Sequence, residues 1–195
     1  MERQRLFISL DLPLGIKEAA GKVQERLQEA QTSKNIYWNI IWTRPGGMHL
    51  TLKFLGEVEA GRIQEIQAAL VESIHAFRPI SIAVEGLGGF PTMHAPRVIW
   101  LGIKEPSGEL LSFQKRVDQA VAPLGFPPEM REFHPHLTLG RVKSPKGRDV
   151  LVQVLKALDP GRLGEWRLEE LNLMQSMIQP DGTVYTKLSM MKAEI

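Results

Sequence analysis

Hydrophobic residues recur along the chain with two periods, and together these predict an alternation of strands and helices. Residues 5–10 are a nearly continuous apolar run, which is typical of a buried strand. Residues 13–30 then place Ile16, Val23 and Leu27 at helical spacing. On the same grounds we expect strands within residues 36–47, 48–58 and 80–87 and a helix over residues 60–77.

The same order of elements begins again near residue 97. Residues 97–103 correspond to the first strand, and His136 follows His49 by 87 residues within a second copy of the sequence His-Leu-Thr-Leu. The second half is expected to contain helices over residues 106–125 and 147–158 and strands over residues 165–178 and 184–193. The repeat predicts a single domain, residues 1–195, built from two α+β lobes (approximate repeats 5–90 and 97–175). Helices would lie outside, with the two His-Leu-Thr-Leu strands facing each other across a central cleft.

Composition and charge limit the chemistry available to this chain. Its 43% hydrophobic and 24% charged residues are typical of a folded globular protein, and a net charge of +2 permits a phosphate-bearing ligand. The absence of cysteine excludes disulfides, thiol nucleophiles and thiolate metal sites. The first residues are too briefly apolar for a signal peptide or a membrane span, so we expect a cytoplasmic protein.

Two pairs of polar residues interrupt the predicted strands that carry the repeated sequence. Because side chains alternate along a strand, His49 and Thr51 share one face, as do His136 and Thr138. Two imidazoles and two hydroxyls around one point suit displacement at phosphorus, in which one group deprotonates water and another protonates the leaving oxygen. An imidazole, with an ordinary pKa of about 6.5, can take either role near neutral pH. The threonines would donate to the non-bridging phosphate oxygens.

These residues allow two other interpretations. A lone His-x-Thr pair on a strand is most often a hydrogen-bonded polar pair of the core. Two copies in matching positions favour catalysis, because the surrounding residues differ while these four recur. His134, together with His49, His136 and Glu132, could instead bind a metal. The repeated pattern supplies threonine where two-metal phosphoesterases use acidic ligands, so we expect neither metal nor cofactor.

Six segments spread over nearly the whole chain carry a family resemblance: RLFISLDLP, HLTLKFLGEV, GLGGFP, RVIWLGI, FHPHLTLGRV and PDGTVY. In this order they resemble the 2H phosphoesterase superfamily, specifically the RNA 2′,3′-cyclic phosphodiesterases also called 2′-5′ RNA ligases. It implies a bilobal, pseudo-twofold α+β fold with two antiparallel sheets lining a central cleft. It also implies metal-independent hydrolysis of cyclic phosphate ends to 2′-phosphates, with His49 as the acid that protonates O3′ and His136 as the base.

Three further residues are candidates for substrate contacts. Arg141, directly after the second motif, could bind phosphate, or it could be a solvated arginine at a strand end. Arg97 could reach the cleft or pair with a neighbouring carboxylate. Phe90, in a Gly-rich loop, could stack on the terminal base or anchor the loop in the core.

The expected partners are RNA 2′,3′-cyclic phosphate termini or small cyclic nucleotides, with no membrane, and the protein is expected to be a monomer. Reverse 2′-5′ ligation would use the same residues. The alternatives are a non-catalytic module that binds nucleotides or RNA ends, and a phosphodiesterase for another cyclic phosphate or a 2′-5′ oligonucleotide.

Overall fold

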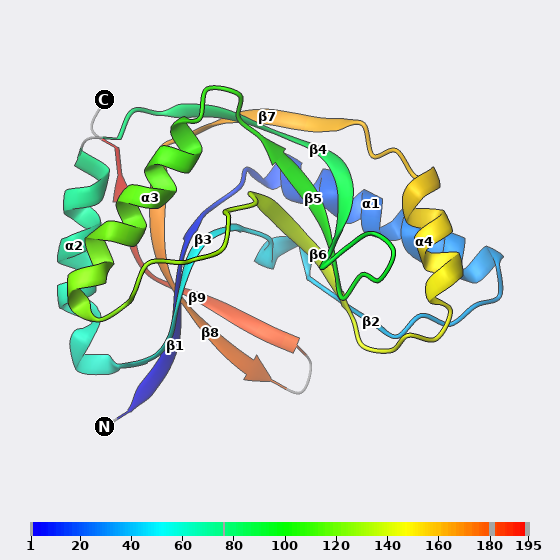
Figure 1. Cartoon of the computed structure of the whole chain (residues 1–195), viewed down its shortest axis with the longest axis horizontal. Coiled ribbons are helices and arrows are strands. Elements are labelled where there is room, and N and C mark those ends of the chain that lie inside the picture. The colour runs from blue at the N-terminus through cyan, green and yellow to red at the C-terminus, as the bar shows by residue number, and fades with distance from the viewer. Residues whose placement is uncertain (1, 76, 180–181, 194–195) are drawn as a thin grey trace.

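The protein consists of a long antiparallel sheet with helices packed against it (Figure 1). A computed structural model describes residues 2–75, 77–179 and 182–193. Within them, the helices are α1 (Leu14–Ser33), α2 (Ile63–His75), α3 (Glu109–Val121) and α4 (Arg148–Ala157). The strands are β1 (Arg3–Leu10), β2 (Ile40–Trp42), β3 (Leu50–Glu59), β4 (Ile80–Phe90), β5 (Val98–Lys104), β6 (His136–Val142), β7 (Arg162–Leu168), β8 (Glu170–Gln179) and β9 (Gly182–Lys192).

The strands follow the order β7-β4-β5-β6-β3-β1-β8-β9, and β2 pairs with β6 outside this path. At the centre, β3 and β6 are joined through one residue pair, Leu50 with Leu137. The sheet therefore has two halves that meet between the strands carrying the repeated motif. The predicted α+β fold is confirmed, with one difference of detail. The two motif strands are direct neighbours and do not face each other across a gap.

Each half of the sheet draws on both of the sequence ranges that were compared as repeats. β4, from the first range, pairs with β5 and β7, whereas β8, from the late part of the chain, pairs with β1. The helices are distributed in the same way, since α1 contacts α4 and β7, while α2 contacts α3, β8 and β9. Figure 1 shows these two helix pairs at opposite ends of the molecule. That residues 5–90 and 97–175 are repeats of one domain stays a prediction.

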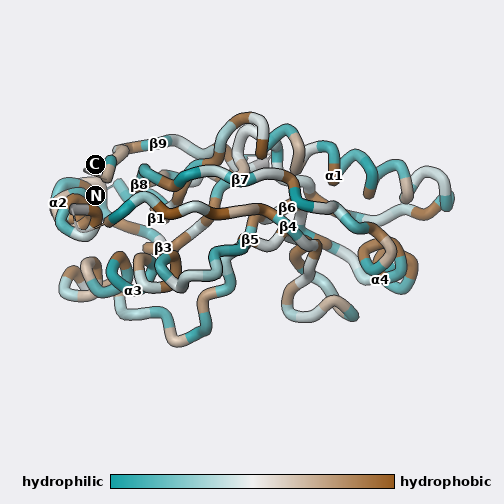
Figure 2. The backbone as a smooth tube through the Cα atoms, turned by 90° about the horizontal axis from the view of Figure 1, so that it is seen from above, coloured by the Kyte–Doolittle hydropathy of each residue, from teal (hydrophilic) through white to brown (hydrophobic). Residues whose placement is uncertain are grey.

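The hydrophobic pattern explains why these segments pack as they do. Ile16, Ala20, Val23 and Leu27 of α1 are buried at the predicted spacing. In Figure 2, each helix alternates between hydrophobic and hydrophilic stretches, as expected for helices with one face on a sheet.

The prediction of one strand over residues 165–178 was wrong. The segment forms two strands, β7 and β8, separated at the exposed Glu169. Here the chain leaves the half of the sheet that contains β4 and enters the half that contains β1. Because Leu168 and Leu171 on either side are both buried, the sequence carries a nearly continuous strand pattern across this crossing.

Candidate active site

The two repeated motifs lie where the halves of the sheet join. Because β3 and β6 run antiparallel through the pair of Leu50 and Leu137, His49 lies toward Thr138 along the strands, and Thr51 lies toward His136. The motif leucines are buried in the core, while both histidines and both threonines are half-buried. We call the sheet surface that carries these four polar side chains the motif face.

Both histidine rings are oriented by the same local hydrogen bond. Nδ1 of His49 lies 2.8 Å from the carbonyl oxygen of Gly47, and Nδ1 of His136 lies 2.6 Å from that of His134. A carbonyl oxygen only accepts, so each Nδ1 carries the hydrogen and each Nε2 is left available for a ligand. The two motifs thus present their imidazoles in the same tautomer.

The surroundings lower the pKa of both histidines. Burial is the largest cause for His49, and the positive charge of Lys17 and interaction with His136 add to it, against the opposing effects of the Gly47 carbonyl and Asp11. For His136, burial is again the largest cause, with Arg141 and His134 adding to it. Both rings therefore favour the neutral form near pH 7, in which Nε2 can accept a proton.

Aromatic rings pack against each histidine in a similar manner. Tyr185 meets His49 edge-on, with ring centroids 4.9 Å apart, and Phe90 meets His136 edge-on at the same distance. Phe7 and Trp100 lie behind them, at 4.7 Å from His49 and 6.1 Å from His136 respectively. These contacts contribute to the burial that lowers the histidine pKa values.

A cavity of about 310 Å³ lies beside His49. Its lining includes Ser9, Asp11, Lys17, Arg44, Asn172 and Tyr185. Asp11 bonds Lys17 at 2.6 Å and Lys187 at 3.3 Å. Burial by itself would raise the pKa of Asp11, but the Lys17 hydrogen bond, the Leu12 amide and the two lysine charges together lower it. Two cationic side chains, Lys17 and Arg44, line the cavity together with His49, and this is compatible with an anionic ligand.

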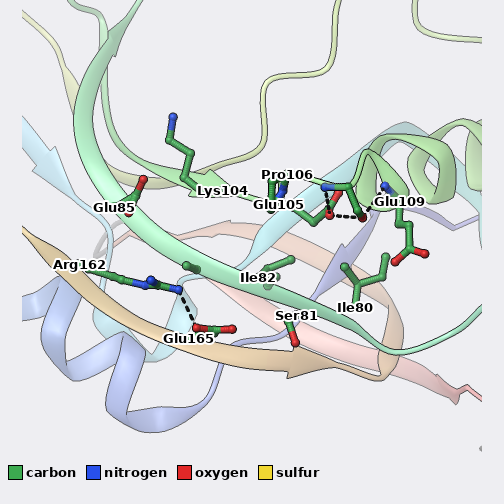
Figure 3. A pocket seen from close by; sticks show the side chains of 12 residues that line it. Ile80, Ser81, Ile82, Glu85, Lys104, Glu105, Pro106, Glu109, Arg162 and Glu165 are labelled. Carbon is green, nitrogen blue, oxygen red and sulfur yellow. Dashed lines mark hydrogen bonds and ion pairs between the residues drawn. The ribbon is translucent and has the colours of Figure 1, made fainter.

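A larger cavity, of about 670 Å³, lies away from the motifs, over β4, β5, β7 and the start of α3 (Figure 3). Its charged side chains are partly paired with each other, as between Arg162 and Glu165 at 2.6 Å. Glu105 accepts hydrogen bonds from the backbone of Ser107 and Leu110. No residue of the two motifs lines this cavity.

The other predicted contact residues occupy different settings. Arg141 is exposed on β6, between Ile41 and Val98, and is close enough to His136 to affect its pKa. Arg97 is exposed, and its backbone nitrogen donates to the carbonyl oxygen of Phe90 at 2.6 Å. Phe90 itself packs between His136 and Trp100, whose ring centroid is 5.1 Å away.

No group of three His, Asp or Glu side chains suited to a metal occurs among the residues that the structure describes. His134 and Glu132, the candidate ligands, lie 3.9 Å apart on an exposed segment. In the described part of the chain, no helix has the length and apolar character needed to cross a membrane.

Sequence reasoning missed several residues of the site. Tyr185 lies within the PDGTVY segment but had no assigned role, although it packs on His49 and lines the cavity. Asn172 on β8 is 1% exposed, and no partner for its amide is found in the described structure. Phe54 also had no assigned role; its side chain is 63% exposed, and its ring centroid lies 6.1 Å from that of Phe7, which packs on His49. No spacing rule connects β8 or β9 with the motifs, because the contacts arise from the sheet order.

Known proteins resemble this chain over most of its length. The 2′-5′ RNA ligase superfamily profile matches residues 22–177. An RNA 2′,3′-cyclic phosphodiesterase of Methanothermobacter thermautotrophicus is 31% identical, over 96% of this chain and 98% of that protein. One of Aeropyrum pernix is 37% identical over 74% and 81%. Among solved structures, TT0787 of Thermus thermophilus gives a TM-score of 0.78 with 26% identity, covering 96% and 97% of the two chains. E. coli LigT complexed with 3′-AMP gives 0.68 with 26% identity, covering 98% and 99%.

Proposed function

The chain belongs to the 2′-5′ RNA ligase superfamily, and from this we propose that it hydrolyses RNA 2′,3′-cyclic phosphate ends to 2′-phosphates without a metal. The prediction of an enzyme of the cyclic phosphodiesterase class is confirmed by relatives that cover nearly the whole chain. The catalytic roles of individual residues, and the choice between hydrolysis and ligation, are part of our proposal.

The two histidines divide the proton transfers between them. The neutral His136 accepts a proton from water at Nε2 while the water oxygen forms a bond to phosphorus, and the bond from phosphorus to O3′ breaks. His49 protonates the departing O3′. Although burial lowers its pKa in the free protein, the negative charge of a bound phosphodiester raises the pKa of a neighbouring imidazole. His49 would therefore take up its proton as the substrate binds.

The remaining polar groups of the motif face would hold the phosphate. Thr51 and Thr138 donate to its non-bridging oxygens, with each bond to the anion worth roughly 1.5–3 kcal/mol. Arg141 and Arg97 supply positive charge. Phe90, which already packs on His136, offers the remainder of its ring to the terminal base.

The observation that carries this proposal is the matched pair of imidazoles. Both are fixed through Nδ1 and both leave Nε2 available, at the junction where each histidine lies toward the threonine of the other motif. A polar pair of the core would have its hydrogen-bonding groups satisfied from within the protein. Ligation to a 5′-hydroxyl is the same chemistry in reverse, with an alcohol in place of water.

The test is to incubate the purified protein, in EDTA, with a short RNA ending in a 2′,3′-cyclic phosphate, and to assign the product by phosphorus NMR. A 2′-phosphate made in EDTA supports the proposal, provided that His49→Asn and His136→Asn abolish it. A 3′-phosphate would reverse the assignment of the leaving oxygen. Tight binding of the cyclic end without turnover would favour the non-catalytic binding module. The molecular mass of the same purified protein in solution tests whether it is a monomer, as expected. Cell fractionation tests the expected cytoplasmic location.

A further inference from the structure

The last residue of each motif is an irregularity in its strand. Between the pairs Ile8–Lys53 and Ser9–Thr51, β3 contains one residue more than β1, so Leu52 is the bulged residue. The second motif repeats this. Between the pairs of Ile99 with Gly140 and Trp100 with Thr138, β6 contains one extra residue, Leu139. A bulge bends its strand, redirects the neighbouring side chains and takes a backbone carbonyl out of the regular ladder.

A buried glutamine from a helix reaches each bulged carbonyl. Nε2 of Gln24, on α1, donates to the carbonyl oxygen of Leu139 at 2.7 Å. Nε2 of Gln114, on α3, donates to that of Leu52 at 3.4 Å. Gln24 is 5% exposed and Gln114 is 6% exposed, so both are polar side chains on the buried faces of their helices.

The hydrogen bonds around the second bulge are complete. The Leu139 carbonyl also accepts from the backbone nitrogen of Thr43 at 2.8 Å, so both of its lone pairs are used. The other hydrogen of the Gln24 amide goes to the carbonyl oxygen of Thr43, at 2.8 Å. One side chain therefore ties α1, the segment after β2 and the bulge of β6 together.

The first bulge is held by a different combination. The bond from Gln114 to Leu52 is the longer of the two, but the next residue, Lys53, is also fixed to α3 through its ion pair with Asp118. Lys53 further donates to the carbonyl oxygen of Pro127 at 2.7 Å. Two side-chain contacts, from Gln114 and from Lys53, thus attach the first bulge to α3, whereas Gln24 alone attaches the second bulge to α1.

We propose that Gln24 and Gln114 are positioning residues, each of which fixes the bulge after one motif and so orients the histidine and threonine before it. Gln24 controls His136 and Thr138, and Gln114 controls His49 and Thr51. An apolar residue would fill the same space, but the bulged carbonyl would lose its bond to the helix; Leu139 would then be held only by the Thr43 amide, and the first bulge only through Lys53. With one of its contacts removed the bulge can shift, and a displacement near 1 Å at a reacting group can cost about a hundredfold in rate.

The experiment separates the two motifs by measuring each histidine on its own. The pKa values of His49 and His136 are followed by NMR in the free protein, with resonances assigned from the His49→Asn and His136→Asn variants. Gln24→Met is expected to raise the His136 pKa toward 6.5, because a loosened strand admits water, and to leave His49 unchanged. Gln114→Met is expected to raise the His49 pKa, by a smaller amount because Lys53 still ties β3 to α3, and to leave the His136 pKa nearly unchanged. Arg141 and His134 act on His136, while Lys17, Asp11 and His136 itself act on His49, and none of these residues is substituted in the glutamine variants.

Matched controls are provided by exposed glutamines on the same helices, Gln28 on α1 and Gln119 on α3. Gln28→Met and Gln119→Met should leave both histidine titrations and kcat unchanged. Gln24→Met should lower kcat by about ten- to a hundredfold, with a smaller change in KM. If Gln24→Met does not fold, Gln24→Asn keeps the amide but is one methylene too short to reach both carbonyls.

The proposal is overturned if the Gln24 and Gln114 variants lose stability while both histidine titrations and kcat stay as in the unaltered protein, since both glutamines would then be core residues only. It is also overturned if either substitution shifts both histidines equally. The kcat measurement rests on the proposed function. The titrations do not, so a protein without turnover would still show whether each glutamine controls its own motif.

Discussion

A buried ion pair next to the first motif offers the sharpest quantitative test of how this site is held. Lys53 on β3 and Asp118 on α3 form the pair, with side chains only 6% and 9% exposed. Both partners also hold the segment that leads to His136. Lys53 donates to the carbonyl oxygen of Pro127 at 2.7 Å, and Asp118 accepts from the backbone nitrogen of Glu129 at 2.9 Å.

Removing one member of such a pair leaves the other charge buried without compensation. Lys53→Met keeps most of the apolar stem and deletes only the ammonium group, so the expected loss is that of a broken buried pair, about 3–5 kcal/mol in the free energy of unfolding. In a chain of this size, that corresponds to a fall of roughly 6–20 °C in Tm. Replacing both partners, as Lys53→Met with Asp118→Leu, removes the uncompensated charge and should restore most of the loss. Pro127 and Glu129 are exposed, so water can satisfy their backbone groups in the double variant.

Urea denaturation of both single variants and the double variant gives the coupling energy, and Lys115→Met on the exposed face of α3 is the matched control. Trypsin supplies a local readout, because Arg131 is exposed within the held segment. Cleavage after Arg131 should be faster in Lys53→Met than in the control variant. A single-variant loss below about 1 kcal/mol would place this pair among surface ion pairs and refute the reasoning.

Three further predictions concern the motif residues. His49→Ala and His136→Ala should each lower kcat at least about a hundredfold, and Thr51→Val and Thr138→Val by a smaller amount. The measurement is steady-state kinetics on a cyclic-phosphate RNA, with urea denaturation of each variant as the control for folding. A folded variant with unchanged kcat would remove that residue from the mechanism. Because burial lowers both histidine pKa values, the unfolded chain binds more protons than the folded one between those values and about pH 6.5. The free energy of unfolding should therefore decrease as the pH falls through this window. A His49→Asn/His136→Asn variant should show a shallower decrease in urea denaturation, and an unchanged slope would contradict the assignment. Tyr185→Ala should raise the His49 pKa toward 6.5 by admitting water, while Tyr185→Phe keeps the ring and the lowered value; NMR titration would expose any dependence on the hydroxyl instead.

The hydrophobic pattern was sufficient to predict most of the elements, because each buries at least one face. The spacing of Ile16, Val23 and Leu27 gave α1, and the alternation around Leu50 and Leu137 gave the two motif strands. These patterns report burial along a single segment. They therefore hold wherever a segment packs in one piece, and they fail at Glu169, where the chain crosses from one half of the sheet to the other.

The surroundings of the site could not be predicted in this way, since they depend on which strands become neighbours. Tyr185 lies on β9 and contacts His49 across β8 and β1. The order of β9, β8 and β1 in the sheet cannot be read from the periodicity of the sequence. Lys53 gives no sign in the sequence that its side chain is buried. A regular strand would place it on the same face as Thr51, and only the bulge at Leu52 redirects it toward α3.

The bulges also explain why a strand pattern could predict the motif residues and still miss what positions them. Within each motif, alternation places the histidine and threonine on one face and the leucines in the core. Directly after each threonine the extra residue breaks that alternation, and a glutamine of the helix behind the strand donates to the carbonyl of that residue. The same interruption occurs at the same place in both halves, each time with a glutamine from a different helix. The sheet has other irregularities, such as the one at Leu55 of β3, so a bulge alone does not mark the motifs. What the two motif bulges share is a buried glutamine from a helix, and on this we base the proposal that they orient the two imidazoles.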